Sequence, residues 1–172
     1  MTQGRPLGEH HYALTSTWTG NLGTGTSGYR DYRRDVTIEV DGKPALAASS
    51  DKPFRGDPQR WNPEDLLVAA LSECHLLSYL HACVTAGVVV TSYRDEATGI
   101  MREDGRGSGA FAEVTLHPQV TVADASMIES AQRAHEQAHE CEGADRALAV
   151  CKTGRLMSPS LLVPSPQSPV TS

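Results

Sequence analysis

The first part of the chain alternates hydrophobic and polar positions in the manner of β-strands. Residues 32–40 place apolar side chains at every second position from Val36 onward, which is the period of a strand with one buried face. Asp41-Gly42 follows, a strong short signal for a hairpin turn, and residues 43–48 supply the returning strand. Residues 11–19 are also rich in β-branched and aromatic side chains. We therefore predict a small group of strands before residue 50.

One long apolar segment at the centre of the chain predicts a helix with clear ends. Residues 62–65 read Asn-Pro-Glu-Asp, which combines a favoured N-cap, proline at the first helical position and two acids in the first turn. From residue 66 to about residue 84 the apolar side chains cover nearly all sides of such a helix, and Gly87 ends it. A helix without one polar face is expected to be buried on most sides.

The remainder of the chain predicts further strands, a second helix and a tail. The strands are expected at residues 88–93, 98–103, 110–116 and 120–122, and the second helix from about Asp124 to about Glu140. Strands, a central helix, strands and a second helix in this order are typical of the α+β class. We expect one domain over residues 1–158, followed by a disordered tail over residues 159–172, which are rich in Pro and Ser.

Composition and charge limit the partners. The 172 residues include 15 Lys and Arg against 21 Asp and Glu, and a negative chain without a basic stripe is not expected to bind nucleic acid. The longest uninterrupted apolar run, Leu66–Leu71, is far shorter than the ~20 residues of a membrane span, and residues 1–20 hold no apolar signal core. Gly23-x-Gly25 is not followed by a helix, so it is no phosphate cradle. We expect a cytoplasmic protein with no cofactor and no membrane partner.

The segment from His135 to His139 reads His-Glu-Gln-Ala-His and matches a helical zinc-binding pattern. Residues four apart share one helical face, but a third ligand is needed and no histidine follows His139. We therefore expect no metal here, and a metal-dependent hydrolase on His135 and His139 is an alternative hypothesis. His75 and His81, in the central helix, are expected to be interior groups rather than ligands.

Four cysteines are the candidate reactive groups: Cys74, Cys83, Cys141 and Cys151. They are too few and too scattered for a disulfide-stapled fold and form no Cys-x-x-Cys pair. Buried structural thiols are the commoner case on residue type alone. Cys83 lies on another side of the central helix from Cys74, so Cys141, at the end of the second helix, is the better partner for Cys74.

A reactive thiol needs a nearby cation, because the thiolate is the nucleophilic form. The candidate cations are Arg55 and Arg60, in the loop before the central helix, and Arg30, Arg33 and Arg34, further toward the N-terminus. Glu64 is suited to orient one of these guanidinium groups through a two-pronged carboxylate pair. A thiol activated in this way beside a resolving thiol is what a thiol peroxidase or a redox sensor requires.

The residues around Cys74 carry a family resemblance. The segment Asn-Pro-Glu-Asp-Leu-Leu at 62–67, followed by Ala-Ala-Leu-Ser-Glu-Cys-His at 69–75, resembles the central-helix signature of the OsmC/Ohr family. Residues 49–57, 12–18, 93–95 and 99–101 resemble its OsmC-like branch, and the resemblance runs from about residue 9 to residue 141.

This resemblance implies an α+β fold in which antiparallel sheets wrap around a buried central helix, in an interwoven homodimer. It also implies a thiol-dependent peroxidase that reduces organic hydroperoxides in oxidative-stress defence and is recycled by a dithiol reductant of lipoyl type. By position, Cys74 is the peroxidatic thiol, Arg55 its activating cation and Glu64 the carboxylate that orients Arg55. Cys141 is the resolving thiol.

The C-terminus departs from the family pattern, because Cys141 stands about one residue early and is followed by Glu-Gly-Ala-Asp-Arg instead of a strand sequence. Cys151 is therefore a rival for the resolving role. An OsmC-fold protein that senses redox state, or binds a small apolar molecule without catalysis, is the second hypothesis, and the metal-dependent hydrolase is the third.

Overall fold

The structure, a computed structural model, describes residues 8–105, 108–141, 154–156 and 160–163. Its helices are α1 (Pro63–Thr85) and α2 (Ile128–Cys141), with two short 3-10 turns, η1 (Lys52–Phe54) and η2 (Ala125–Met127). Its strands are β1 (Thr15–Trp18), β2 (Val36–Glu39), β3 (Leu46–Ala48), β4 (Val90–Asp95), β5 (Thr98–Glu103), β6 (Gly109–Leu116), β7 (Pro118–Val122), β8 (Gly154–Leu156) and β9 (Ser160–Leu162). The α+β class is confirmed.

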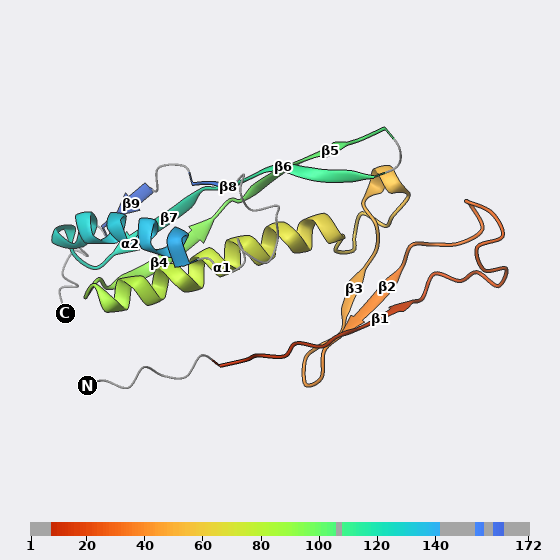
Figure 1. Cartoon of the computed structure of the whole chain (residues 1–172), viewed down its shortest axis with the longest axis horizontal. Coiled ribbons are helices and arrows are strands. Elements are labelled where there is room, and N and C mark those ends of the chain that lie inside the picture. The colour runs from red at the N-terminus through yellow and green to blue at the C-terminus, as the bar shows by residue number, and fades with distance from the viewer. Residues whose placement is uncertain (1–7, 106–107, 142–153, 157–159, 164–172) are drawn as a thin grey trace, which may run out of the picture. The chain divides into compact units, whose positions relative to one another are not determined.

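The chain divides after Leu66 into two compact units, each with its own sheet structure. In the first unit, β1, β2 and β3 form an antiparallel sheet (Figure 1), with Ile38 opposite Ser16 on one side and Leu46 on the other. The hairpin predicted at Asp41-Gly42 is present, and Gly42 adopts a φ of 73° that a side chain disfavours. A longer excursion, residues 19–35, connects β1 with β2.

The second unit contains two three-stranded sheets, in the orders β4-β7-β9 and β5-β6-β8. β5 and β6 form the long hairpin in the upper part of Figure 1, and the strands β8 and β9 add to the sheets in parallel. The main core lies where α1 and α2 pack against β4 and β7. Its buried members are Tyr79, Ala82, Cys83, Val88, Val120, Val122, Ala131, Ala134 and Ala138.

The central helix begins and ends where the sequence predicts. The Asn62 side chain accepts a hydrogen bond from the backbone N–H of Asp65 at 2.7 Å, which caps the first turn. At the other end, Gly87 has a φ of 70°, the left-handed conformation in which helices commonly stop. Residues about one turn apart (71, 75, 79, 82 and 83) form the buried stripe of α1.

The expectation that α1 is buried on most sides is not met within one chain. The Leu77 side chain is 58% exposed and Val84 is 79% exposed, although both are apolar. The buried stripe faces α2 and the sheet of the second unit, and these elements cover only one side of a helix that is apolar nearly all round. The described residues therefore leave a large apolar face of α1 uncovered.

By length and composition alone, the 23 residues of α1 would also suffice to cross a membrane. Two of its polar side chains, however, bind other elements of the second unit: Ser72 donates to Asp95, and His75 shares a hydrogen bond with His135. These contacts place α1 in the core of a folded domain, for which a long apolar helix is equally typical.

The predicted boundary between domain and tail needs correction. Residues 160–162, assigned above to the disordered segment 159–172, form β9 and pair with β7, with Leu161 opposite Val120. Leu161 also packs against the main core. The physical reason is that β7 has a free edge on the side away from β4. The backbone of residues 160–162 pairs with that edge, and the apolar side chain of Leu161 packs against the core beside it. Residues 164–172 lie outside the described residues.

Candidate active site

Two cysteines of α1 differ sharply in their surroundings. Cys74 is a free thiol with a partly buried side chain, whereas Cys83 is almost completely buried in the main core. Burial raises the pKa of the Cys83 thiol, although its contact with the Tyr79 hydroxyl partly opposes this. Because a protonated, inaccessible thiol is a poor nucleophile, Cys83 is a core residue and Cys74 is the better candidate for chemistry.

The turn of α1 that carries Cys74 is anchored to the sheet beneath it. Ser72 donates a hydrogen bond of 2.5 Å to Oδ2 of Asp95, at the end of β4. The other oxygen of Asp95 accepts from the backbone N–H of His117 at 2.7 Å, just before β7. One carboxylate thus joins the helix to two strands, which fixes the backbone two residues from Cys74.

The residue after Cys74 belongs to a buried aromatic cluster. Nε2 of His75 lies 3.1 Å from Nδ1 of His135 on α2, and both side chains are almost completely buried. The Tyr79 ring stacks on the His135 ring with centroids 3.9 Å apart. Burial and the neighbouring His75 lower the pKa of His135 to about 4, so that His135 is neutral at pH 7.

The protonation pattern of this histidine pair follows from its surroundings. Nε2 of His135 is buried without a hydrogen-bond partner. An orphaned N–H donor is rarer in protein interiors than an unsatisfied acceptor, so we assign the proton of His135 to Nδ1, from which it is donated to His75. This contact could not be predicted from sequence patterns, because its two members are 60 residues apart.

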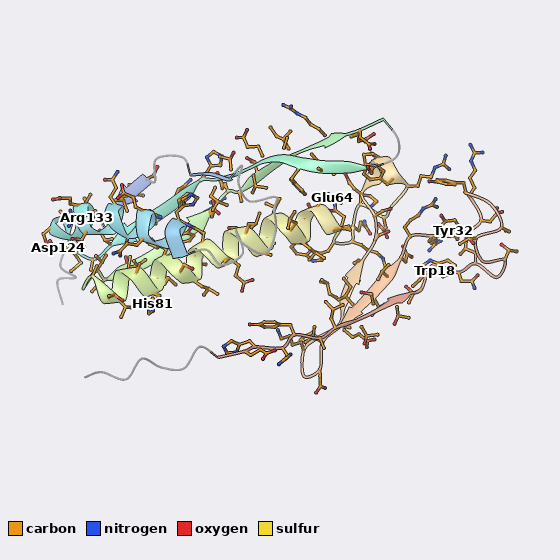
Figure 2. All side chains as sticks on the ribbon, in the orientation of Figure 1. Trp18, Tyr32, Glu64, His81, Asp124 and Arg133 are labelled. Atoms are coloured by element: carbon orange, nitrogen blue, oxygen red, sulfur yellow. The ribbon has the colours of Figure 1, made fainter. Side chains whose placement is uncertain are left out.

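The zinc-binding pattern in α2 is explained by this core contact. His135 faces the interior while His139 is exposed, and the described residues contain no group of three His, Cys, Asp or Glu side chains suited to a metal. The described part of the chain therefore gives the metal-dependent hydrolase no support. Of the two histidines expected inside α1, His75 is buried, but His81 is exposed on the C-terminal half of the helix (Figure 2).

The five candidate arginines differ in the groups that their side chains contact. Arg60 lies 3.5 Å from Asp57 and 3.9 Å from Asp35, so its charge is shared with carboxylates. Arg34 donates to the backbone carbonyls of Tyr29 and Tyr32. Arg55, which caps η1 in the left-handed conformation with a φ of 64°, has an exposed side chain whose guanidinium lies 5.3 Å from the centre of the Tyr29 ring.

Neither Arg55 nor Glu64 is neutralised within the described residues. No ion pair connects Arg55 to a carboxylate there, and Arg30 and Arg33 are likewise exposed and without one. Glu64 stands in the first turn of α1 (Figure 2), with its Oε2 buried and without a hydrogen-bond partner. The pairing of Arg55 with Glu64 therefore stays a prediction.

The resolving thiol also stays a prediction. Cys141 is the last residue of α2, but its side chain lies outside the described residues, as does the whole of Cys151. What the structure does establish is that α2, the helix that ends at Cys141, contacts α1 one residue after Cys74, through His135 and His75.

Comparison with known proteins identifies the family. A model of the family described as OsmC-like protein matches residues 56–144, more than half of the chain. This segment covers α1, α2 and the strands between them. The chain belongs to the OsmC-like protein family.

Solved structures agree with this assignment. An OsmC-like protein of unknown function from Vibrio cholerae has a TM-score of 0.71 and 25% identity, over 91% of this chain and 99% of that one. An organic hydroperoxide resistance protein from Elizabethkingia anophelis has a TM-score of 0.62 and 20% identity, over 91% and 99% respectively. The uncharacterized protein YmaD of Bacillus subtilis is 21% identical over 136 residues, 79% of this chain and 83% of its own. The OsmC/Ohr fold is thereby confirmed.

Acid is expected to destabilise the protein through His135. The unfolded chain takes up a proton near the ordinary value of 6.5, whereas the folded pKa is about 4, so stability falls as the pH drops from 6.5 to 4. The loss from this group is about 3 kcal/mol. Urea unfolding at fixed protein concentration measures it, and a His135→Leu variant should show a flatter pH dependence.

The matched control for this prediction is His81→Leu, which replaces an exposed histidine of α1 and should keep the pH dependence of the unmodified protein. An equal slope in the His135→Leu variant and the unmodified protein would show that His135 is not the group responsible.

Proposed function

We propose that this protein is a thiol peroxidase that reduces organic hydroperoxides with Cys74 as its nucleophile. The observation that carries the proposal is a free, partly buried thiol on an anchored turn of the central helix, in a chain of the OsmC-like family. Relatives of the same fold are named organic hydroperoxide resistance proteins, among them one from Legionella pneumophila with a TM-score of 0.60 and 17% identity.

The proposed reaction begins when the Cys74 thiolate attacks the distal oxygen of a peroxide ROOH. The O–O bond breaks, the departing oxygen takes a proton and leaves as ROH, and Cys74 becomes a sulfenic acid. The Cys141 thiol then attacks the Cys74 sulfur, water leaves, and an intramolecular disulfide forms. A dithiol of lipoyl type reduces the disulfide to two thiols and is itself oxidised.

In this mechanism Arg55 supplies the positive charge that favours the thiolate and stabilises the negative charge on the departing oxygen. This role is supported by the absence, among the described residues, of a carboxylate that pairs with the Arg55 guanidinium. Glu64 would orient Arg55, and its buried, unpartnered Oε2 is an acceptor available for that purpose.

We also propose that the protein is a homodimer. The exposed apolar side chains of α1 would be costly to leave in water, and a second copy of the chain offers an equivalent apolar face to cover them. The side chains of β1 are exposed as well, which leaves the sheet of the first unit open to such a partner. A reducing cytoplasm suits this assignment, because the catalytic cycle requires free thiols.

Replacing the nucleophile is the direct test of the activity. The reduced protein should consume cumene hydroperoxide when dihydrolipoamide is supplied, and Cys74→Ser should reduce turnover to the uncatalysed background. The matched control is Cys83→Ala, which removes the buried thiol of the same helix and should keep the activity. Full turnover by the Cys74→Ser variant, with Cys83→Ala inactive, would move the reactive thiol to Cys83.

The resolving step is tested by mapping the disulfide. After a short exposure to one equivalent of peroxide, peptide mapping should find Cys74 joined to Cys141 within one chain, and Cys141→Ser should leave the Cys74 sulfenic acid trappable by dimedone. Cys151→Ser is the control and should still form the bond. A bond from Cys74 to Cys151 would reassign the resolving thiol, and a sulfenic acid that persists in the unmodified protein would favour a sensor.

The dimer is tested by placing a charge on the uncovered face of α1. Leu77→Glu should shift the protein from dimer to monomer in sedimentation velocity, because a buried carboxylate in an apolar interface is strongly unfavourable. Leu22→Glu is a matched control, since Leu22 is also 58% exposed but lies in the excursion between β1 and β2. A monomeric unmodified protein would contradict the proposal.

A further inference from the structure

The excursion between β1 and β2 is organised around a ladder of aromatic rings and guanidinium groups. Trp18 and Tyr32 stand next to each other (Figure 2), with ring centroids 5.9 Å apart and ring planes at 84°. The indole N–H of Trp18 donates to the carbonyl of Arg33 at 2.8 Å, and the backbone N–H of Arg33 donates to the carbonyl of Gly20. These contacts hold the two sides of the excursion together at its base.

Arg34 continues the ladder from Tyr32 to Tyr29. Its guanidinium carbon lies 4.2 Å from the centre of the Tyr32 ring and 5.1 Å from the centre of the Tyr29 ring. Nη1 donates to the carbonyl of Tyr32 at 2.9 Å and Nη2 to the carbonyl of Tyr29 at 3.0 Å. One side chain therefore contacts both rings and both backbones, which fixes Tyr29 although its side chain is 71% exposed.

Arg55 is the last member of the ladder and lies in a different loop, directly after η1. Its guanidinium carbon lies 5.3 Å from the centre of the Tyr29 ring, within the ~6 Å over which a cation is attracted to an aromatic face. The Tyr29 ring is thus contacted by two cations, Arg34 and Arg55. Among the described residues this ring is the partner of the Arg55 guanidinium, because no carboxylate pairs with it.

The backbone of Arg55 is fixed independently of the ring. Its N–H donates to the carbonyl of Lys52, and the N–H of Gly56 donates to the carbonyl of Asp51. A Cβ at Gly56 would lie 1.4 Å from the carbonyl oxygen of Ser50, so the loop closes too tightly for any other residue there. The start of the Arg55 side chain is therefore set by its own loop, and only its far end depends on Tyr29.

We propose that Tyr29 is a positioning residue for Arg55: its ring holds the guanidinium in the orientation in which Arg55 activates Cys74. This inference rests on the proposed function, since it assigns Arg55 the activating role. The ring restrains the guanidinium without neutralising its positive charge. The charge then stays available for a thiolate and for the departing oxygen.

The experiment measures the reactivity of Cys74 alone. Reduced protein is treated with iodoacetamide between pH 5 and pH 9, and mass spectrometry of the Cys74 peptide gives the alkylation rate of this one thiol. At low pH, Tyr29→Leu should react about two- to fivefold more slowly than the unmodified protein, the factor expected for loss of an exposed cation–π contact. The two rates should converge at high pH, where the thiolate forms without help.

Three variants separate positioning from general damage. Tyr29→Phe keeps the ring, so its Cys74 should react at the rate of the unmodified protein. Tyr29→Gln replaces the ring with a polar side chain and should behave like Tyr29→Leu. Tyr12→Leu replaces a tyrosine that is 92% exposed and lies outside the contacts of Arg34 and Arg55 with aromatic rings, so it should change nothing. Thermal unfolding of each variant shows that the fold is retained.

An Arg55→Leu variant distinguishes failure of this inference from failure of the proposed function. If Arg55→Leu slows Cys74 at low pH but neither Tyr29→Leu nor Tyr29→Gln does, Tyr29 has no positioning role and Arg55 keeps its own. If Arg55→Leu reacts normally and Arg30→Leu does not, the activating role passes to Arg30 and both proposals about Arg55 are wrong. A slowing by Tyr29→Phe as large as by Tyr29→Leu would also overturn the inference.

Discussion

The structure depends on one constraint, which is that a long helix without a polar face must be covered. One side of α1 is covered by α2 and the sheet of the second unit, through a stripe of residues about one turn apart. The other side retains side chains as apolar as Leu77 and Val84 in contact with water. Because the hydrophobic effect grows with the apolar area removed from water, the helix is incompletely stabilised in a single chain. The proposed dimer follows from this constraint as much as from family membership.

Polar contacts decide how α1 sits on its own unit. Apolar packing is not directional, so it permits a helix to slide or rotate, whereas a hydrogen bond between buried groups has a defined geometry. Asp95 fixes the turn at Ser72, and the pair His75–His135 fixes the next turn against α2. Cys74 lies between these two contacts. The thiol is therefore carried by a part of α1 that directional contacts hold on both sides, which suits the proposed nucleophile.

The sequence was sufficient for features set by local chemistry. The cap at Asn62, the hairpin at Asp41-Gly42 and the strand at 98–103 depend on neighbours in the chain, and all three are present. It was insufficient where contacts join distant segments. Strand β9 forms because β7 offers an open edge, which no property of residues 160–162 reveals alone. His135 matched a zinc motif, although its actual partner is 60 residues away.

The candidate site shows the same division, because motif residues were predictable and their partners were not. Glu64 was expected to orient Arg55, and each lacks an oppositely charged partner among the described residues. A buried carboxylate oxygen without a hydrogen-bond donor, such as Oε2 of Glu64, is energetically costly. A cation held against a ring costs little, since the ring leaves its charge exposed. Among the described residues, the buried Oε2 of Glu64 and the positive charge of Arg55 are therefore both available to a further partner, as the proposed mechanism requires.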